Sequence, residues 1–132
     1  MNGAAMPSTN ATRTVRTARF ILFLASGLFA LGVAVQMFLA GLALFIDSTR
    51  WTAHSNFASY IGLIPVLLLL LTFPARMPGK TKVKCILLIV LTIGIFITAM
   101  LSGKIGWISA AHPVMALGLF FNSILILRES RE

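Results

Sequence analysis

Charged residues are scarce in this sequence, and acidic residues are the scarcest of them. Of 132 residues, 11% are charged and three are Asp or Glu. Soluble domains carry about 25% charged residues, so this chain has too few to cover a water-exposed surface. Together with a mean hydropathy of +0.97, this scarcity excludes a soluble protein and predicts an integral membrane protein.

The residues from which common reactive sites are built are also few. Cys85 is the single cysteine, so no internal disulfide can form and there is no C-x-x-C-H motif for covalent haem attachment. The sequence has no G-x-S-x-G motif, no glycine-rich phosphate loop and no pair of carboxylates inside an apolar run. These absences argue against a hydrolase or transferase and leave at most a redox or electron-transfer component.

Basic residues are more numerous, with a net charge of +8, and they are unevenly distributed. Two of them, Arg50 and Lys104, lie in the connections after the first and third apolar runs. The other nine flank the opposite ends of the runs: Arg13, Arg16, Arg19, Arg76, Lys80, Lys82, Lys84, Arg128 and Arg131. By the positive-inside rule, this asymmetry places both termini in the cytoplasm. It also favours contact with anionic lipid over nucleic-acid binding.

Four apolar runs make up most of the chain. The runs are predicted at about 19–46, 51–73, 83–101 and 109–127. A span needs about 20 apolar residues, and in lipid only helices or closed barrels satisfy the backbone. With short connections, residues 18–128 are therefore predicted to form an all-α, antiparallel, up-down-up-down four-helix bundle. Residues 1–17 are expected to be a flexible cytoplasmic tail, and residues 129–132 a short C-terminal tail.

The two histidines each follow a tryptophan at the outer start of an apolar run. His54 comes three residues after Trp51, and His112 comes five residues after Trp107. If both tryptophans mark the membrane interface, the helical rise puts the imidazoles within about 3 Å of the same depth. Spans two and four lie diagonally across a sequential bundle, so both rings can face its centre. Two axial imidazoles would make a haem iron six-coordinate and low-spin, which suits electron transfer.

Small and cationic neighbours favour such a site. Ala58 and Gly62 follow His54 at intervals of one helical turn, and Ala116 follows His112 in the same way. Small side chains there would leave volume for a macrocycle, although small residues also let membrane helices approach closely. Arg50 and Lys104 are placed to pair with haem propionates, or else to extend to the interface.

Gln36 is a polar residue near the middle of the first run. A buried amide needs hydrogen-bond partners, so Gln36 is expected to bond another helix or to contact a bound cofactor or quinone. In the third run, Gly94, Thr98 and Ser102 recur every four residues and predict a helix-packing face.

Three segments resemble a group of small bacterial four-span membrane proteins that is defined as a domain of unknown function. These segments are residues 36–42, Trp51 with His54, and residues 111–116 (Ala-His-Pro-Val-Met-Ala). The likeness covers most of residues 30–127 and implies no particular activity. In architecture alone, the chain is similar to four-helix membrane b-type cytochromes of the cytochrome b561 superfamily. Those proteins often hold two haems on four histidines, whereas two histidines imply at most one bis-His haem here.

The sequence therefore predicts a bacterial inner-membrane protein that binds one haem b near its outer face through His54 and His112. Its electron-exchange partner would be a quinol or a redox protein, and assembly as a homo-oligomer stays open. Two other interpretations of the histidines remain: hydrogen bonding without a cofactor, and a quinone, proton or transition-metal role. The alternative function is a cofactor-free membrane subunit or small carrier whose polar residues only mediate helix packing.

Overall fold

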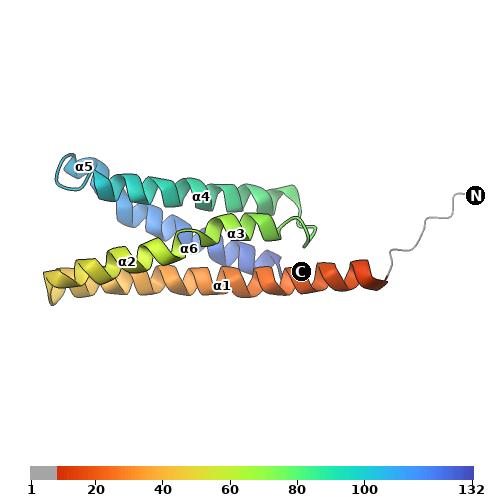
Figure 1. Cartoon of the computed structure of the whole chain (residues 1–132). Helices are drawn as coiled ribbons and strands as arrows, with labels where there is room; N and C mark the ends of the chain where they lie inside the picture. Colours follow the sequence, from red (N-terminus) through yellow and green to blue (C-terminus); the bar gives the residue numbers. More distant parts are fainter. Residues whose placement is uncertain (1–8) are drawn as a thin grey trace, which may run out of the picture.

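The protein, described here by a computed structural model for residues 9–132, is all-helical over that range. Within it, four helical segments are long and apolar enough to cross a membrane: Asn10–Phe45, Ser48–Leu71, Gly79–Met100 and Gly106–Glu129. Short turns join them into an antiparallel bundle (Figure 1). The predicted all-α four-helix membrane fold is confirmed. Residues 1–8 of the predicted tail lie outside the described residues.

Helix α1 (Thr9–Phe45) is the longest element. Its 37 residues rise about 55 Å, well beyond a hydrocarbon core of about 30 Å. The helix therefore begins at Thr9, within the segment that was expected to be a flexible tail. No Pro or Gly interrupts residues 9–19, and extending an existing helix costs much less than nucleating a new one. The apolar span thus continues into its polar, arginine-bearing N-terminal end.

The second span is broken, where a single helix was predicted. It consists of the 3-10 turn η1 (Ser48–Arg50), α2 (Trp51–Ile61) and α3 (Ile64–Leu71). Pro65 causes the break, because it has no N–H to donate to the Ile61 carbonyl and its ring crowds that carbonyl. Helix α2 packs against α1, whereas α3 packs against both α1 and α4. The break therefore lets α2, the half of this span next to the turn at Asp47, pack along α1.

The other two spans differ from the prediction mainly at their ends. Helix α4 (Gly79–Met100) begins directly after Pro78, within the stretch expected to be a loop. The fourth span is a short α5 (Gly106–Ser109) followed by α6 (Ala111–Glu129). This interruption is explained by Pro113, which cannot donate a hydrogen bond to the carbonyl of Ser109.

The buried core lies in the half of the bundle that contains the C-terminus, marked C in Figure 1. The largest completely buried side chains are Leu22, Phe29, Leu68, Leu88 and Ile126. Among the described residues, α2 and α5 contribute no buried side chain. The half of the bundle that contains the predicted histidine site is therefore packed less tightly than the half that contains the termini.

Polar contacts close this core at the same end. The Glu129 carboxylate on α6 forms an ion pair with Lys84 on α4 and lies 3.7 Å from the Lys80 ammonium. Thr81 donates a 2.7 Å hydrogen bond to the second carboxylate oxygen. Because the Glu129 side chain is only 15% exposed, these contacts are partly shielded from solvent and join α4 to α6.

At the opposite end, Asp47 shapes the turn between α1 and α2. Its carboxylate accepts hydrogen bonds from the Thr49 hydroxyl, at 2.7 Å, and from the Thr49 backbone N–H, at 2.9 Å. These bonds favour the charged carboxylate and hold the pKa of Asp47 below its ordinary value. The carboxylate is thereby retained as the cap of η1.

Glu129→Gln should weaken the junction of α4 and α6. The amide can still accept hydrogen bonds but carries no charge, so Lys84 loses its ionic partner and stability should fall by about 1–2 kcal/mol. Unfolding in mixed micelles, followed by circular dichroism as SDS is added, measures the change. Glu132→Gln removes the same charge outside the ion-pair network and is the control. Equal midpoints for the two variants would contradict the assigned role.

Candidate cofactor site

The two histidine rings lie next to each other across the bundle. His54 on α2 and His112 on α6 are both half-buried, and their ring centroids are 6.4 Å apart. The ring planes are tilted by 43°. Trp51, one turn before His54, contacts the His54 ring edge-on with centroids 5.4 Å apart. Two residues 58 positions apart in the sequence thus form one site.

His54 and Gln36 are joined by two hydrogen bonds. The Gln36 side-chain amide donates to the His54 backbone carbonyl at 2.7 Å. The Nδ1 atom of His54 lies 3.1 Å from the Gln36 backbone carbonyl. Because a carbonyl oxygen only accepts, His54 must carry its ring proton on Nδ1. Gln36 therefore fixes both the backbone and the ring of His54.

His112 is held in a similar way by α4. Its Nδ1 atom lies 3.1 Å from the Thr98 hydroxyl oxygen. That hydroxyl donates its single proton to the Ile95 carbonyl at 2.9 Å, so Nδ1–H of His112 is the donor to Thr98. Ser109 adds a further link, donating to the Thr98 backbone carbonyl at 3.1 Å.

These contacts determine which ring nitrogens are free for chemistry. With the proton of each neutral imidazole on Nδ1, the lone pair of each ring is on Nε2. Ligating histidines in metalloproteins usually donate their second N–H to a carbonyl or hydroxyl, which fixes the tautomer and orients the ring. His54 and His112 both have this arrangement, with Gln36 and Thr98 as the orienting partners.

The five polar residues of the site come from all four spans and form a polar belt. Its members are Gln36, His54, Thr98, Ser109 and His112. Within each helical hairpin, the histidine of the second span bonds to the span that precedes it. The belt therefore consists of two similar halves that meet at the histidine rings.

One fully buried side-chain oxygen of the belt lacks a partner among the described residues. Oε1 of Gln36 is buried and accepts no hydrogen bond within the described residues. A buried acceptor left unpaired costs about 1–3 kcal/mol. Oε1 of Gln36 can therefore accept a hydrogen bond from a ligand that carries an O–H or N–H donor.

The small residues predicted to line a pocket are only partly free. Ala58 and Ala116 are half-buried, one turn from His54 and His112 respectively. The space beside Gly62 is filled by the Phe96 ring of α4, because a Cβ atom at Gly62 would lie 3.1 Å from that ring. Its lack of a side chain therefore accommodates Phe96 in the present packing.

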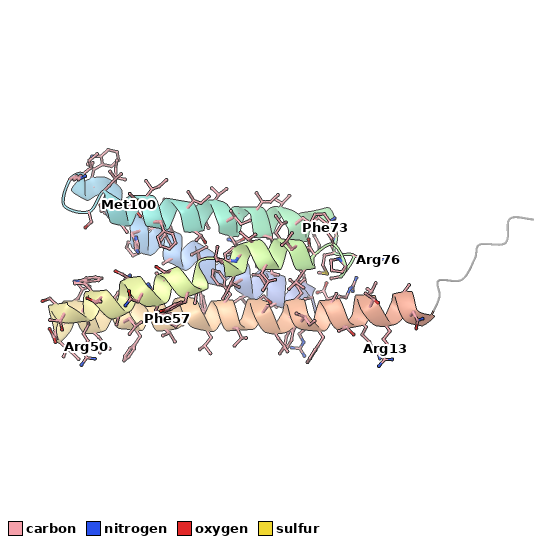
Figure 2. All side chains as sticks on the ribbon, viewed as in Figure 1. Arg13, Arg50, Phe57, Phe73, Arg76 and Met100 are labelled. Carbon is pink, nitrogen blue, oxygen red and sulfur yellow. The ribbon has the colours of Figure 1, made fainter. Side chains whose placement is uncertain are left out.

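Arg50 and Lys104 lie at exposed turns at the belt end of the bundle. Figure 2 shows Arg50 at the end opposite Arg13 and Arg76. Neither Arg50 nor Lys104 takes part in an ion pair within residues 9–132. Both cations are thus available to an anionic group.

Two members of the belt were not predicted from the sequence. Thr98 was assigned only to a packing face, and Ser109 only to the start of a span. A usable signal was present for Thr98, which lies in the last turn of α4, as His112 lies in the first turn of α6. Such positions come to one level in an antiparallel hairpin, so an intramembrane hydroxyl there is a natural histidine partner.

The donor set limits the kinds of metal centre that the site suits. No group of three or more His, Cys, Asp or Glu side chains that could hold a metal ion occurs in the described part of the chain. Two imidazoles are too few for a closed tetrahedral zinc site. They are sufficient for a metal that arrives with its other ligands already bound, as in a porphyrin.

The fold and the belt define a multi-pass membrane protein with a paired-histidine site between its spans. The chain belongs to a family of unknown function (DUF6220), whose model matches residues 36–101. This match includes Gln36, His54 and Thr98 and ends before His112. No curated protein and no solved structure matches the chain. The architectural likeness to b-type cytochromes therefore has no support from these comparisons.

Thr98→Val should release the ring of His112 without moving His54. Valine has a similar shape but cannot accept a hydrogen bond, so the Nδ1–H tautomer of His112 loses its stabilising partner. Nitrogen-15 NMR of ring-labelled histidine in the cofactor-free protein measures the tautomer. Thr92→Val is the matched control, since Thr92 bonds only to Leu88 of its own helix. An unchanged His112 spectrum in Thr98→Val would contradict the hydrogen bond.

Proposed function

We propose that this protein binds one b-type haem between His54 and His112 and serves in single-electron transfer. The observation that carries the proposal is the pairing of two imidazoles, 6.4 Å apart, with both Nδ1 atoms bonded to the protein. Two metal–nitrogen bonds of about 2.0 Å, together with the ring radii, separate two axial imidazole centroids by about 6 Å. This similar separation supports His54 and His112 as the pair that would hold the haem iron.

The chain supplies three features that such a ligand needs. His54 and His112 present Nε2 lone pairs, and Gln36 and Thr98 hold the rings in that tautomer. The surrounding apolar helices exclude water, which tunes the potential of a bound redox centre. A haem held by His54 and His112 would supply reversible one-electron chemistry.

The outer half of the bundle favours the accommodation of a flat ligand. Helix α2 packs against α1 and has no buried side chain. Ala58 and Ala116 keep the faces next to the histidines small. Arg50 and Lys104, at the same end of the bundle, are suited to propionate groups directed towards the interface.

Gln36 supports a quinol as the electron donor. Its unpaired Oε1 is a buried acceptor beside His54, and a quinol carries hydroxyl donors of the matching kind. A separate redox protein at the outer surface is the second candidate partner. Assembly as a homo-oligomer is compatible with either partner.

A cofactor-free role is the second candidate function. The reciprocal bonds between Gln36 and His54 favour it, since they join α1 and α2 without any ligand. Interhelical hydrogen bonds of this kind contribute about 0.6 kcal/mol on average to membrane bundles. In this case the protein is a membrane subunit or small carrier, and its polar belt only stabilises the fold.

The purified protein from haem-replete cells should be red. Its spectrum should show a Soret band with split α and β bands on reduction, and one haem per chain, because two axial nitrogens make the iron low-spin. Either His54→Ala or His112→Ala should abolish the low-spin spectrum, and added imidazole should partly restore it. Asn56→Ala, at an exposed position of α2, is the control. A colourless wild-type preparation would contradict the haem proposal and support the cofactor-free role.

We propose further that the belt end of the bundle faces away from the cytoplasm, in a bacterial inner membrane. The arginine and lysine asymmetry supports this orientation. In a Cys85→Ser background, Ser102→Cys should react with a membrane-impermeant maleimide on intact cells, whereas Glu132→Cys should react only after lysis. The reverse pattern would invert the topology.

A further inference from the structure

A hollow at the end of the bundle opposite the polar belt has the character of a binding site. It measures about 520 Å³ and lies between the N-terminal half of α1 and the residues that follow α6. Three arginines line it, namely Arg16, Arg19 and Arg131, together with the aromatic rings of Phe20 and Phe23. We call it the arginine hollow. Its wall thus combines cations with apolar rings.

Two of the arginines are held in place by the protein. The Nε atom of Arg19 donates a 3.1 Å hydrogen bond to the Ala75 carbonyl, which leaves its terminal nitrogens as further donors. The Arg131 guanidinium lies 5.6 Å from the Phe23 ring centroid, in cation–π range. Because the two side chains are already positioned, less entropy is lost when they bind an anion.

The protein leaves these cations undercompensated. Within the described residues, Arg16, Arg19 and Arg131 form no ion pair. The nearby Glu129 is occupied by Lys84 and Lys80 of α4. Glu132 is the single acidic side chain that lines the hollow. The formal charge of the lining side chains is therefore positive. The hollow therefore offers unpaired cations to an external anion.

The position of the hollow identifies the anion. Arg19 and Phe20 mark the point at which the polar end of α1 gives way to its apolar span. Phe20 is 60% exposed and belongs to a span that is long and apolar enough to cross a membrane. A ligand must therefore be anionic at one end and apolar at the other, as an anionic phospholipid is.

We propose that the arginine hollow is a specific site for an anionic phospholipid. Arg16, Arg19 and Arg131 bind the phosphodiester, for which the planar guanidinium fork is well shaped. Phe20 and Phe23 contact the first part of the acyl chains. The hollow lies at the other end of the bundle from the histidines. The lipid-site proposal therefore does not depend on haem binding.

Two double variants separate a specific site from general attraction of the basic end. Arg16→Gln with Arg131→Gln removes one cation of the hollow from α1 and one from the C-terminal residues that follow α6. Arg13→Gln with Arg128→Gln removes the same charge from α1 and from the last turn of α6, at positions that do not line the hollow. Arg19 is kept in both, because it also bonds Ala75. Circular dichroism verifies that each variant is folded.

Retention of lipid by the full chain is the measurement. The protein is purified in micelles with equal amounts of phosphatidylglycerol and phosphatidylcholine, and bound lipid is counted by native mass spectrometry. The wild type should retain phosphatidylglycerol preferentially. The hollow variant should lose about 25-fold in affinity, at about fivefold per cation, and the control pair, whose cations do not line the hollow, should lose clearly less. If the hollow variant does not fold, Arg131→Gln alone should lose about fivefold.

Two results would overturn the proposal. Equal losses in the two double variants would mean that only the overall charge of this end attracts lipid. Displacement of the lipid by millimolar inorganic phosphate would mean that the hollow is a site for small anions. Phe20→Ala distinguishes these cases further, because it should weaken lipid retention and leave phosphate binding unchanged.

Discussion

The structure depends on one constraint: in lipid, a polar group has to find its partner inside the protein. The four spans satisfy it by forming helices, in which most backbone groups are paired within the segment. The same constraint governs the few polar side chains. Gln36 and Thr98 each pair with a histidine of the neighbouring span, and Glu129 pairs with lysines of α4. These contacts fix how the helices meet.

The bundle is consequently divided into two halves with different properties. The half near the termini holds the apolar core and is closed by the Glu129 ion pairs. The half near the turns at Asp47 and Lys104 holds the polar belt and fewer buried side chains. Pro65 marks the boundary between the halves on the second span, because the helix is broken there and α2 and α3 run in different directions (Figure 1). A closely packed half thus supports a half with fewer buried side chains, in which the two histidines meet.

Much of this organisation could be predicted from the order and composition of the apolar runs. The length and apolarity of the runs predicted four spans, and the two histidines were recognised as one pair because a hairpin topology brings them to the same level. Other features depended on neighbours that are remote in sequence. Gly62 was expected to leave space for a macrocycle, yet Phe96 of α4 packs against it. The helical start at Thr9 was missed because propensity underestimates the extension of an established helix.

The sequence by itself determined that the chain is helical and membrane-spanning, since hydropathy and backbone pairing in lipid leave few other solutions. It also determined that its positive charge gathers at one end. Only the tertiary structure decided the partners of each histidine and therefore which ring nitrogen is free. It also decided that Arg16, Arg19 and Arg131 line one hollow. Hydrogen bonding and side-chain packing act between segments far apart in the chain, and their geometry is set when the helices pack.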